Sequence, residues 1–398
     1  MLLQLALACA GEQPDSTAPT AADPTYYADI KPILDEDCAR CHVQGGLAPS
    51  FEEPADVVAL ADAIVSYVDA GLMPPPAPDP ACRDYEHSER FVLSAEQKAT
   101  LREWAAAGAP LGEPEAQVDG PGPLASIGPF DKELYGSAAY QPSFGGDGND
   151  YRCFVLNLDN PSPVFFTGLE AIVDNDAIVH HVVLFQTREV TAEQLAPDGF
   201  YCSGFGDPTW SLLAAWAPGG TPLQFPDGLG MRLNNGTSLI LQMHYYDSFD
   251  GADQEFDQSG YGLLFTDSVE REVVQLPYGV TQFTIPAGEE NVEVNDSERW
   301  MGDDAELLAV FPHMHQTGVA FHMDVKSKDD TDPCIVDIAG WNFHNQLIPT
   351  FSEPVPLHNG DRVQTTCTYS NPSNTDVEWG EQTDQEMCFG FAWVVDAL

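Results

Sequence analysis

The stretch IVHHVVLFQT, residues 178–187, decides how most of this chain folds. β-Branched and aromatic residues dominate it, which is typical of a β-strand with at least one buried face. The same texture returns at TSLILQMHYYD (237–247), ELLAVFPHMHQTG (306–318) and MCFGFAWVV (387–395), and Asn, Asp, Gly and Pro separate such runs. Alternation at period two with this punctuation predicts antiparallel β-sandwiches rather than βαβ units.

The β-rich region is too long for one small sandwich, since it covers about 270 residues. We divide it near residue 275 into two all-β, antiparallel, jelly-roll-like domains, residues 129–275 and 276–398. Upstream, residues 24–112 carry apolar residues at helical spacing, and Pro and Gly in residues 113–128 predict a linker. The expected fold class is a small all-α domain followed by two β-sandwiches.

Composition excludes several classes of function. The 398 residues contain 15 Lys and Arg against 63 Asp and Glu, a formal net charge of −48. Such a surface repels phosphate backbones and anionic lipids, which excludes nucleic-acid binding and a polybasic membrane contact. At 43% hydrophobic residues the chain is not a disordered one. No apolar run reaches the roughly 18 residues that a membrane span needs.

The N-terminal residues 1–23 predict export. A short apolar stretch ends in small residues before Cys9 and resembles the remnant of a secretory signal with a bacterial lipoprotein acceptor site. Residues 10–23 are small and polar and predict a flexible tether. We therefore expect a periplasmic or cell-surface protein, and acylation of Cys9 stays open.

Residues 38–42, CARCH, form a C-x-x-C-H motif, the attachment signature of c-type haem. Cys38 and Cys41 lie three residues apart, so that their thiols reach the two vinyl groups, and His42 is placed to ligate the iron. The alternative is a redox or zinc pair beside an incidental histidine. The motif predicts a covalently attached haem c.

The second axial ligand is expected to be Met73, in AGLMPPP. The prolines that follow keep the chain extended near the haem edge, and His87 is the alternative ligand. The order of ADIKPIL, CARCH, LMPPP and LREWAAAGAP over residues 25–112 resembles small bacterial class I-like cytochrome c domains.

Five of the ten histidines fall into three strand-like motifs. His313 and His315 are two residues apart, so one strand face presents both and they could hold one metal ion. His180 and His181 are adjacent, and both rings converge only at a twisted strand end or a bulge. Together with His244 they predict imidazole-rich sites suited to copper, zinc or iron, although a single such histidine is more often structural.

The order of the motifs resembles the copper type II, ascorbate-dependent monooxygenases, which include peptidylglycine-hydroxylating and dopamine β-hydroxylating enzymes. The resemblance covers about residues 130–398. It rests on four motifs, which are His180-His181, Gln242-Met243-His244-Tyr245, His313-Met314-His315 and Glu386-Met387-Cys388.

The resemblance implies two copper ions with different tasks. The copper held by His180, His181 and His244 stores and passes on an electron. The copper held by His313, His315 and Met387 binds O2 and oxidises the substrate, and the soft thioether favours the Cu(I) state. Gln242 is expected to line the path between the two sites.

The resemblance also implies a disulfide between Cys367 and Cys388, which would fix the strand that carries Met387. Of the remaining cysteines, Cys153 with Cys202 is the next expected pair. Cys82 and Cys334 stay unassigned, and either could be a free thiol.

Three aromatic residues depart from the pattern of the peptide-hydroxylating members. Phe311 stands where they carry a carboxylate-binding Arg, and Phe389 and Phe391 stand where they carry Asn and Tyr. We therefore expect a substrate with an apolar or aromatic C–H donor instead of a C-terminal glycine peptide. The alternative is that these rings only pack the core.

The expected function is an exported monooxygenase that hydroxylates a C–H bond of a small organic substrate with O2. The fused haem would deliver electrons one at a time, supplementing or replacing ascorbate or another one-electron donor, and a redox partner is possible. Two other classes stay open: a haem and copper electron-transfer or copper-binding protein without hydroxylase activity, and a structural or adhesion module whose histidines are merely packed.

Overall fold

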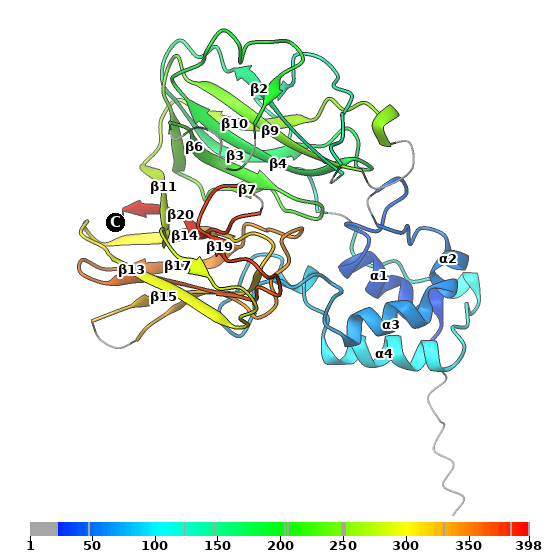
Figure 1. Ribbon diagram of the computed structural model, residues 1–398. Coiled ribbons are helices and arrows are strands. Elements are labelled where there is room, and N and C mark those ends of the chain that lie inside the picture. Colours follow the sequence, from blue (N-terminus) through cyan, green and yellow to red (C-terminus); the bar gives the residue numbers. More distant parts are fainter. Residues whose placement is uncertain are drawn as a thin grey trace, which may run out of the picture.

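The computed structural model describes residues 23–396, except residues 47, 123, 147, 203, 205–206, 208, 248–251, 329–330 and 383. Helices α1 to α4 form one body beside two β-rich bodies, one built mainly from β2 to β10 and the other from β13 to β20 (Figure 1). Cys9 and the expected signal and tether, up to residue 22, lie outside the described residues. No described helix is both long enough and apolar enough to span a bilayer.

The N-terminal body is helical, as expected. Its elements are the π-helical turn η1 (Tyr26–Ile30), α1 (Lys31–Asp37), α2 (Pro54–Ala59), α3 (Ala61–Asp69), the 3₁₀ turn η2 (Ser88–Arg90), α4 (Ala95–Ala106) and the 3₁₀ turn η3 (Pro114–Ala116). Helix α4 begins with a capping box, because Ser94 Oγ accepts a hydrogen bond from Gln97 N and Gln97 Oε1 accepts one from Ser94 N. Trp104 and Leu101 of α4 are buried in the hydrophobic core of the helical body, which is separate from the cores of the sandwiches.

The first sandwich places a five-stranded sheet, in the order β5-β2-β9-β4-β6, against part of a nine-stranded sheet. Its strands are β1 (Lys132–Tyr135), β2 (Asn149–Asn157), β3 (Val164–Ile172), β4 (Val179–Thr187), β5 (Phe200–Tyr201), β6 (Ser211–Trp216), β7 (Leu223–Gln224), β8 (Leu229–Leu233), β9 (Ser238–Tyr246) and β10 (Gly260–Thr266), with the 3₁₀ turn η4 (Ala252–Gln254) before β10.

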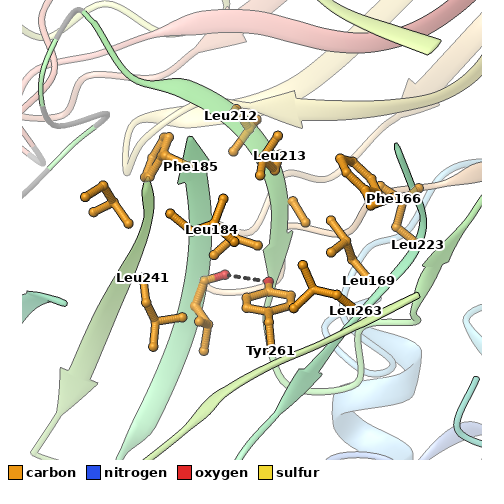
Figure 2. Close-up of a cluster of buried hydrophobic side chains, with 14 of the residues drawn as sticks. Phe166, Leu169, Leu184, Phe185, Leu212, Leu213, Leu223, Leu241, Tyr261 and Leu263 are labelled. Atoms are coloured by element: carbon orange, nitrogen blue, oxygen red, sulfur yellow. Dashed lines mark hydrogen bonds between the residues drawn. The ribbon is translucent and has the colours of Figure 1, made fainter. Parts of the chain in front are cut away.

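Leucine and aromatic side chains fill the space between these two sheets (Figure 2). Leu184 of β4 and Leu241 of β9 come from one sheet, and Phe166 of β3 and Leu263 of β10 from the other. Each is at most 1% exposed, and burying such a side chain stabilises the fold by roughly 1.5–3 kcal/mol. This packing fixes β4 and β9, the strands that carry His180, His181 and His244.

The second sandwich pairs a four-stranded sheet, in the order β13-β18-β15-β16, with the rest of the nine-stranded sheet. Its strands are β11 (Arg271–Val280), β12 (Thr284–Ile285), β13 (Val292–Arg299), β14 (Ala305–His313), β15 (Gly318–Lys326), β16 (Cys334–Ile338), β17 (Thr350–Leu357), β18 (Arg362–Tyr369), β19 (Val377–Glu378) and β20 (Cys388–Asp396).

One sheet runs through both sandwiches, in the order β1-β10-β3-β8-β11-β20-β14-β17. Strand β11 joins the halves, since it pairs with β8 in parallel, Arg271 facing Leu229, and with β20 in antiparallel fashion. The division expected near residue 275 therefore falls inside a strand. Strand β11 follows the first sandwich in the chain and extends the same sheet. Its pairing with β8 is parallel, whereas the neighbouring strand pairs of this sheet are antiparallel.

Three disulfides cross-link the described chain. Cys367–Cys388 and Cys153–Cys202 confirm the two expected pairs. The third, Cys82–Cys334, joins the helical body to the second sandwich across a sequence separation of 252 residues. Cys38 and Cys41 form no disulfide.

A strap of residues 76–86, between α3 and α4 of the helical body, lies along the second sandwich. Tyr85 pairs with Phe351 in an isolated β-bridge, and the Tyr85 hydroxyl donates to the Ile335 carbonyl at 3.1 Å. Asp79 N donates to the Asp337 carbonyl at 2.8 Å. With the Cys82–Cys334 disulfide, these bonds hold the helical body in place.

Candidate metal and cofactor sites

His180, His181 and His244 meet on two neighbouring strands of the five-stranded sheet. His181 of β4 lies directly opposite His244 of β9. The register between β4 and β9 shifts between Val179 and His181, which is the irregularity that two adjacent histidines need in order to face one point. The strand bulge thus brings His180 to the same side as the other two rings.

The three rings present the same nitrogen to one point. The His180 and His181 Nδ1 atoms are 3.1 Å apart, and the His244 and His181 Nδ1 atoms are 3.3 Å apart. Two nitrogens that each bind one metal ion at about 2.0 Å lie about 3 Å from each other. The arrangement of the three Nδ1 atoms therefore fits one metal ion, and three imidazoles suit copper.

The opposite ring nitrogens of this cluster have partners of their own. His244 Nε2 lies 2.7 Å from Asn149 Oδ1, and His180 Nε2 lies 2.7 Å from His344 Nδ1. Burial lowers the pKa of His180 to about 3, and burial also holds the pKa values of His181 and His244 well below their ordinary value. The rings are thus neutral at physiological pH, which is the form that ligates metals.

His313 and His315 lie at the end of β14, in the second sandwich. Their ring centroids are 5.1 Å apart. His313 Nδ1 lies 2.7 Å from Gln346 Oε1, and His315 Nδ1 lies 2.9 Å from the Gln385 carbonyl. Nε2 is therefore the ring nitrogen with which each could ligate a metal. Burial lowers the pKa of both rings, that of His313 to about 3.

Met387 is the residue that the motif pattern assigns to this second cluster. β14 and β20 pair His313 with Phe389, and Met387 lies two residues before Phe389, just outside the start of β20. Met387 is buried, and the Tyr369 hydroxyl donates to its carbonyl at 2.7 Å. The adjacent Cys388 is fixed by its disulfide. Two imidazoles and a thioether would form a donor set that fits copper and is unusual for zinc.

Glu386 stabilises the His313–His315 segment through hydrogen bonds to the main chain. Its carboxylate is fully buried and accepts hydrogen bonds from His315 N at 2.8 Å and from Thr317 N at 2.6 Å. Burial raises the pKa of Glu386 to about 7. The carboxylate thus ties the segment before Met387 to the segment that carries His315.

One cavity, partly open to solvent, touches both clusters. His181 of the first cluster and His313 and His315 of the second line it, and so does Gln242, whose Nε2 donates to the Gly204 carbonyl at 3.0 Å. The remaining wall includes five aromatic side chains, Tyr151, Phe185, Trp216, Phe311 and Phe343, and one carboxylate, Glu381. Gln242 lies on this wall, and its part in the path between the two sites stays a prediction.

Of the three aromatic substitutions, only Phe311 reaches the cavity wall. Its ring lies 5.8 Å from the His313 ring, and Phe391 lies behind it at 6.2 Å. Phe389 stacks on Phe391 and packs against the core of the first sandwich. Phe311 therefore faces the cavity, whereas Phe389 and Phe391 pack the core.

The C-x-x-C-H motif lies on a separate apolar cavity of about 1150 Å³ in the helical body. Cys38, Cys41, His42 and Met73 all line it, together with apolar residues of α3. His42 Nδ1 lies 2.7 Å from the Pro49 carbonyl, which leaves Nε2 as the nitrogen for an axial bond. The two thiols, the imidazole and the thioether on one cavity fit a haem c.

His87, the alternative to Met73, does not line this cavity. Its side chain is 44% exposed and lies 3.9 Å from the Glu89 carboxylate. His87 also has a left-handed backbone, with φ of 62°, which turns the chain at that point. Met73 is thus the better-placed of the two residues.

Sequence reasoning missed three residues that orient the ligands, Asn149, His344 and Gln346, and it named Glu386 only as part of a motif, without this role. His344 and Gln346 lie in the loop between β16 and β17, where no periodic pattern exists. The available signal is chemical, because every ligating imidazole needs a partner on its second nitrogen. That signal calls for polar residues but does not say which ones.

Comparison with protein families gives two matches, in the same order as the two sandwiches. Residues 142–250 match the N-terminal domain of the copper type II ascorbate-dependent monooxygenases, and residues 282–394 match the C-terminal domain. Both ligand clusters fall within the matched residues.

Among curated proteins, rat (Rattus norvegicus) dopamine beta-hydroxylase is 27% identical over 271 residues, covering 61% of this chain and 42% of that protein. Mouse (Mus musculus) DBH-like monooxygenase protein 2 is 26% identical over 241 residues, covering 54% and 38%. The chain thus spans about half or less of the length of the curated relatives it matches.

Among solved structures, the infectious bursal disease virus VP2 subviral particle is similar with a TM-score of 0.21 and 11% identity, covering 66% of this chain and 71% of that one, which is too low to indicate a shared fold. The family matches and the sequence relatives agree with the ligand clusters. This chain belongs to the copper type II ascorbate-dependent monooxygenases.

Proposed function

We propose that this chain is an exported copper monooxygenase that hydroxylates a C–H bond of a small apolar or aromatic substrate, with electrons supplied through a haem c in its helical body. The reaction consumes the C–H compound, O2, two electrons and two protons, and it yields the alcohol and water. The observation that carries the proposal is the single cavity that touches both histidine clusters.

The residues divide the work as the family pattern implies. His180, His181 and His244 would hold one copper ion, and His313, His315 and Met387 would hold the other. When bound, copper supplies one-electron storage at the first site and O2 activation at the second. Neutral, buried imidazoles keep both donor sets ready without a proton having to leave first.

The cavity wall supports an apolar substrate. Phe311 occupies the position of a carboxylate-binding Arg and lies beside His313. Phe343 lies 5.9 Å from the His315 ring, so a second aromatic side chain faces the proposed oxidation site. These rings exclude water and orient an apolar group, because placing a carboxylate among them would bury an unpaired charge.

Cys38, Cys41, His42 and Met73 would hold the haem c, which supplies one-electron transfer when bound. The apolar cavity and the hydrogen bond from the His42 ring to the Pro49 carbonyl support this assignment. The haem would supplement or replace ascorbate as the reductant. Three disulfides support export, since such bonds persist in oxidising compartments. A periplasmic or cell-surface location and a lipid anchor at Cys9 are part of the proposal.

Elemental analysis with a visible spectrum tests the cofactors. Pure protein from a host that attaches haem c should contain one haem and two copper ions per chain. Met387→Ile should lower the copper content by about one and leave the haem spectrum unchanged. Protein that takes up neither copper ion contradicts the proposal and favours histidines that are merely packed.

Oxygen uptake coupled to product analysis tests the reaction. With a reductant and a panel of small aromatic compounds, O2 consumption should be matched by hydroxylated product and abolished by Met387→Ile. Oxygen uptake without product, unaffected by Met387→Ile, favours a haem and copper electron-transfer protein instead.

A further inference from the structure

His344 crosses from the second sandwich to the ligand cluster of the first. It lies in the loop between β16 and β17, and its Nδ1 is 2.7 Å from His180 Nε2. The two rings are nearly perpendicular, at 83°, with centroids 4.8 Å apart. A side chain from one sandwich thus contacts a ligand that belongs to the other.

Metal binding at the cluster would decide which nitrogen of the His180–His344 hydrogen bond carries the proton. His180 Nδ1 faces His181 Nδ1 within the cluster, so a metal ion bound there takes up the Nδ1 lone pair. The neutral His180 ring then carries its proton on Nε2, and this N–H donates a hydrogen bond to His344 Nδ1. His344 consequently fixes both the tautomer and the orientation of the His180 ring.

His344 also lies where two cavities meet. It lines the cavity shared by His181, His313 and His315. It lines as well a second cavity of about 1390 Å³, whose walls include Cys41 and Met73 of the helical body and His180 of the cluster. The side of the helical body that carries the C-x-x-C-H motif therefore faces His180 and His344.

Direct contacts hold the helical body in this orientation. Arg40 Nη1 donates to the Gly219 carbonyl at 3.4 Å, and Cys41 Sγ lies 3.4 Å from the Pro218 carbonyl. Asn345, the residue after His344, donates from Nδ2 to the Pro76 carbonyl at 3.2 Å. The turn after β6 and the His344 loop are thus both attached to the helical body.

We propose that His344 is a positioning residue that fixes His180 from the opposite sandwich and makes the three-histidine site the place where electrons from the helical body enter. The proposal rests on the proposed function, since it assumes a haem donor and a copper acceptor. One electron moves, the haem iron is oxidised from the ferrous to the ferric state, Cu(II) is reduced to Cu(I), and no bond forms or breaks.

The test uses holoprotein with haem and copper, without O2 or substrate. The Cu(II) electron paramagnetic resonance spectrum reports the geometry of both copper sites, of which the three-histidine site is the one that His344 contacts. Reoxidation of the haem after flash photoreduction, followed by its visible absorbance, reports electron entry. His344→Leu should alter the spectrum and slow reoxidation about tenfold or more, whereas His344→Gln, which keeps an acceptor for His180 Nε2, should restore much of both. His358→Leu, on an exposed turn remote from the cluster, is the control and should change neither.

A glycine pair separates docking from ligand geometry. A Cβ at Gly219 would lie 3.0 Å from Cys41 Sγ and 3.2 Å from the Arg40 side chain, whereas one at Gly236 meets nothing within 4 Å. Both glycines have positive φ, 84° and 70°, so the alanine variants carry similar backbone strain. Gly219→Ala should slow haem reoxidation several-fold and leave the copper spectrum unchanged. Gly236→Ala should change neither the reoxidation rate nor the copper spectrum.

Two results would overturn the inference. One is a His344→Leu protein with an unchanged copper spectrum and reoxidation rate. The other is equal behaviour of His344→Leu and His344→Gln, which would make the residue a spacer only. Failure of the unsubstituted protein to bind haem or copper would instead contradict the proposed function, so the two failures are distinguishable.

Discussion

The two ligand clusters are built by different means. The three-histidine site takes its geometry from the main chain, because β4 and β9 pair His181 with His244 and a register shift turns in His180. The second site has its two histidines at a strand end and a methionine just outside the facing strand, so side chains and a disulfide must hold it. Main-chain register resists local change, whereas a site held by side chains depends on each support.

The disulfides should expose this difference most strongly. Replacing both Cys367 and Cys388 with Ala should lower the free energy of unfolding by about 2–5 kcal/mol and release copper from the Met387 site, because the strand start that carries Met387 loses its anchor. Replacing Cys153 and Cys202 with Ala should lower the free energy of unfolding by a similar amount. Copper should stay bound at the three-histidine site. Chemical denaturation and copper analysis measure the two effects.

Equal copper loss in the two double variants would break the comparison. So would retention of both copper ions after loss of Cys367–Cys388. Either outcome would mean that the strand pair β14 and β20 holds Met387 without help from the disulfide.

The outer hydrogen bonds give a smaller effect that is specific to each site. Asn149→Leu removes the partner of His244 Nε2, and Gln346→Leu removes the partner of His313 Nδ1. Loss of such a partner weakens metal binding by about 10–100-fold. We expect each variant to weaken copper binding at its own site, with the larger loss for Gln346→Leu because β14 ends at His313.

Competition with a chelator, followed by the copper spectrum of each site, measures these affinities. Gln346→Glu and Asn149→Asp keep an acceptor oxygen and serve as the matched controls. A variant that weakens both sites equally would show that the shared cavity, and no separate support, sets the affinity.

Local sequence patterns were enough to predict the main strands and the histidine motifs that these strands carry. The alternating runs placed β4, β9, β14 and β20, and adjacent histidines called for the bulge that the β4–β9 register contains. The serine and glutamine of the capping box could be predicted because both residues act within one helical turn.

Contacts between distant segments could not be predicted in this way. The Cys82–Cys334 disulfide joins segments 252 residues apart, and β11 carries one sheet from the first sandwich into the second. His344 and Gln346 are recognisable only after the β16–β17 loop has been placed beside the other strands. Periodicity describes the face of an element, whereas these features depend on which faces meet.

A histidine outside both clusters provides the smallest test and sharpens the comparison. In His322 of β15, a hydrogen bond to Asp324 raises the pKa above 6.5 and outweighs burial, whereas burial lowers the pKa of every clustered ring. Because the folded-state pKa is raised, this pair stabilises the fold fully below the ordinary pKa, and the stabilisation is lost as pH rises through the raised value. The side chain is 41% exposed, so His322→Gln should cost only a few tenths of a kcal/mol to about 1 kcal/mol. Denaturation at several pH values should show this cost at pH 5 and little of it at pH 9, with copper binding unaffected at neutral pH. A cost that grows toward high pH would mean that His322 is held neutral, as the clustered rings are.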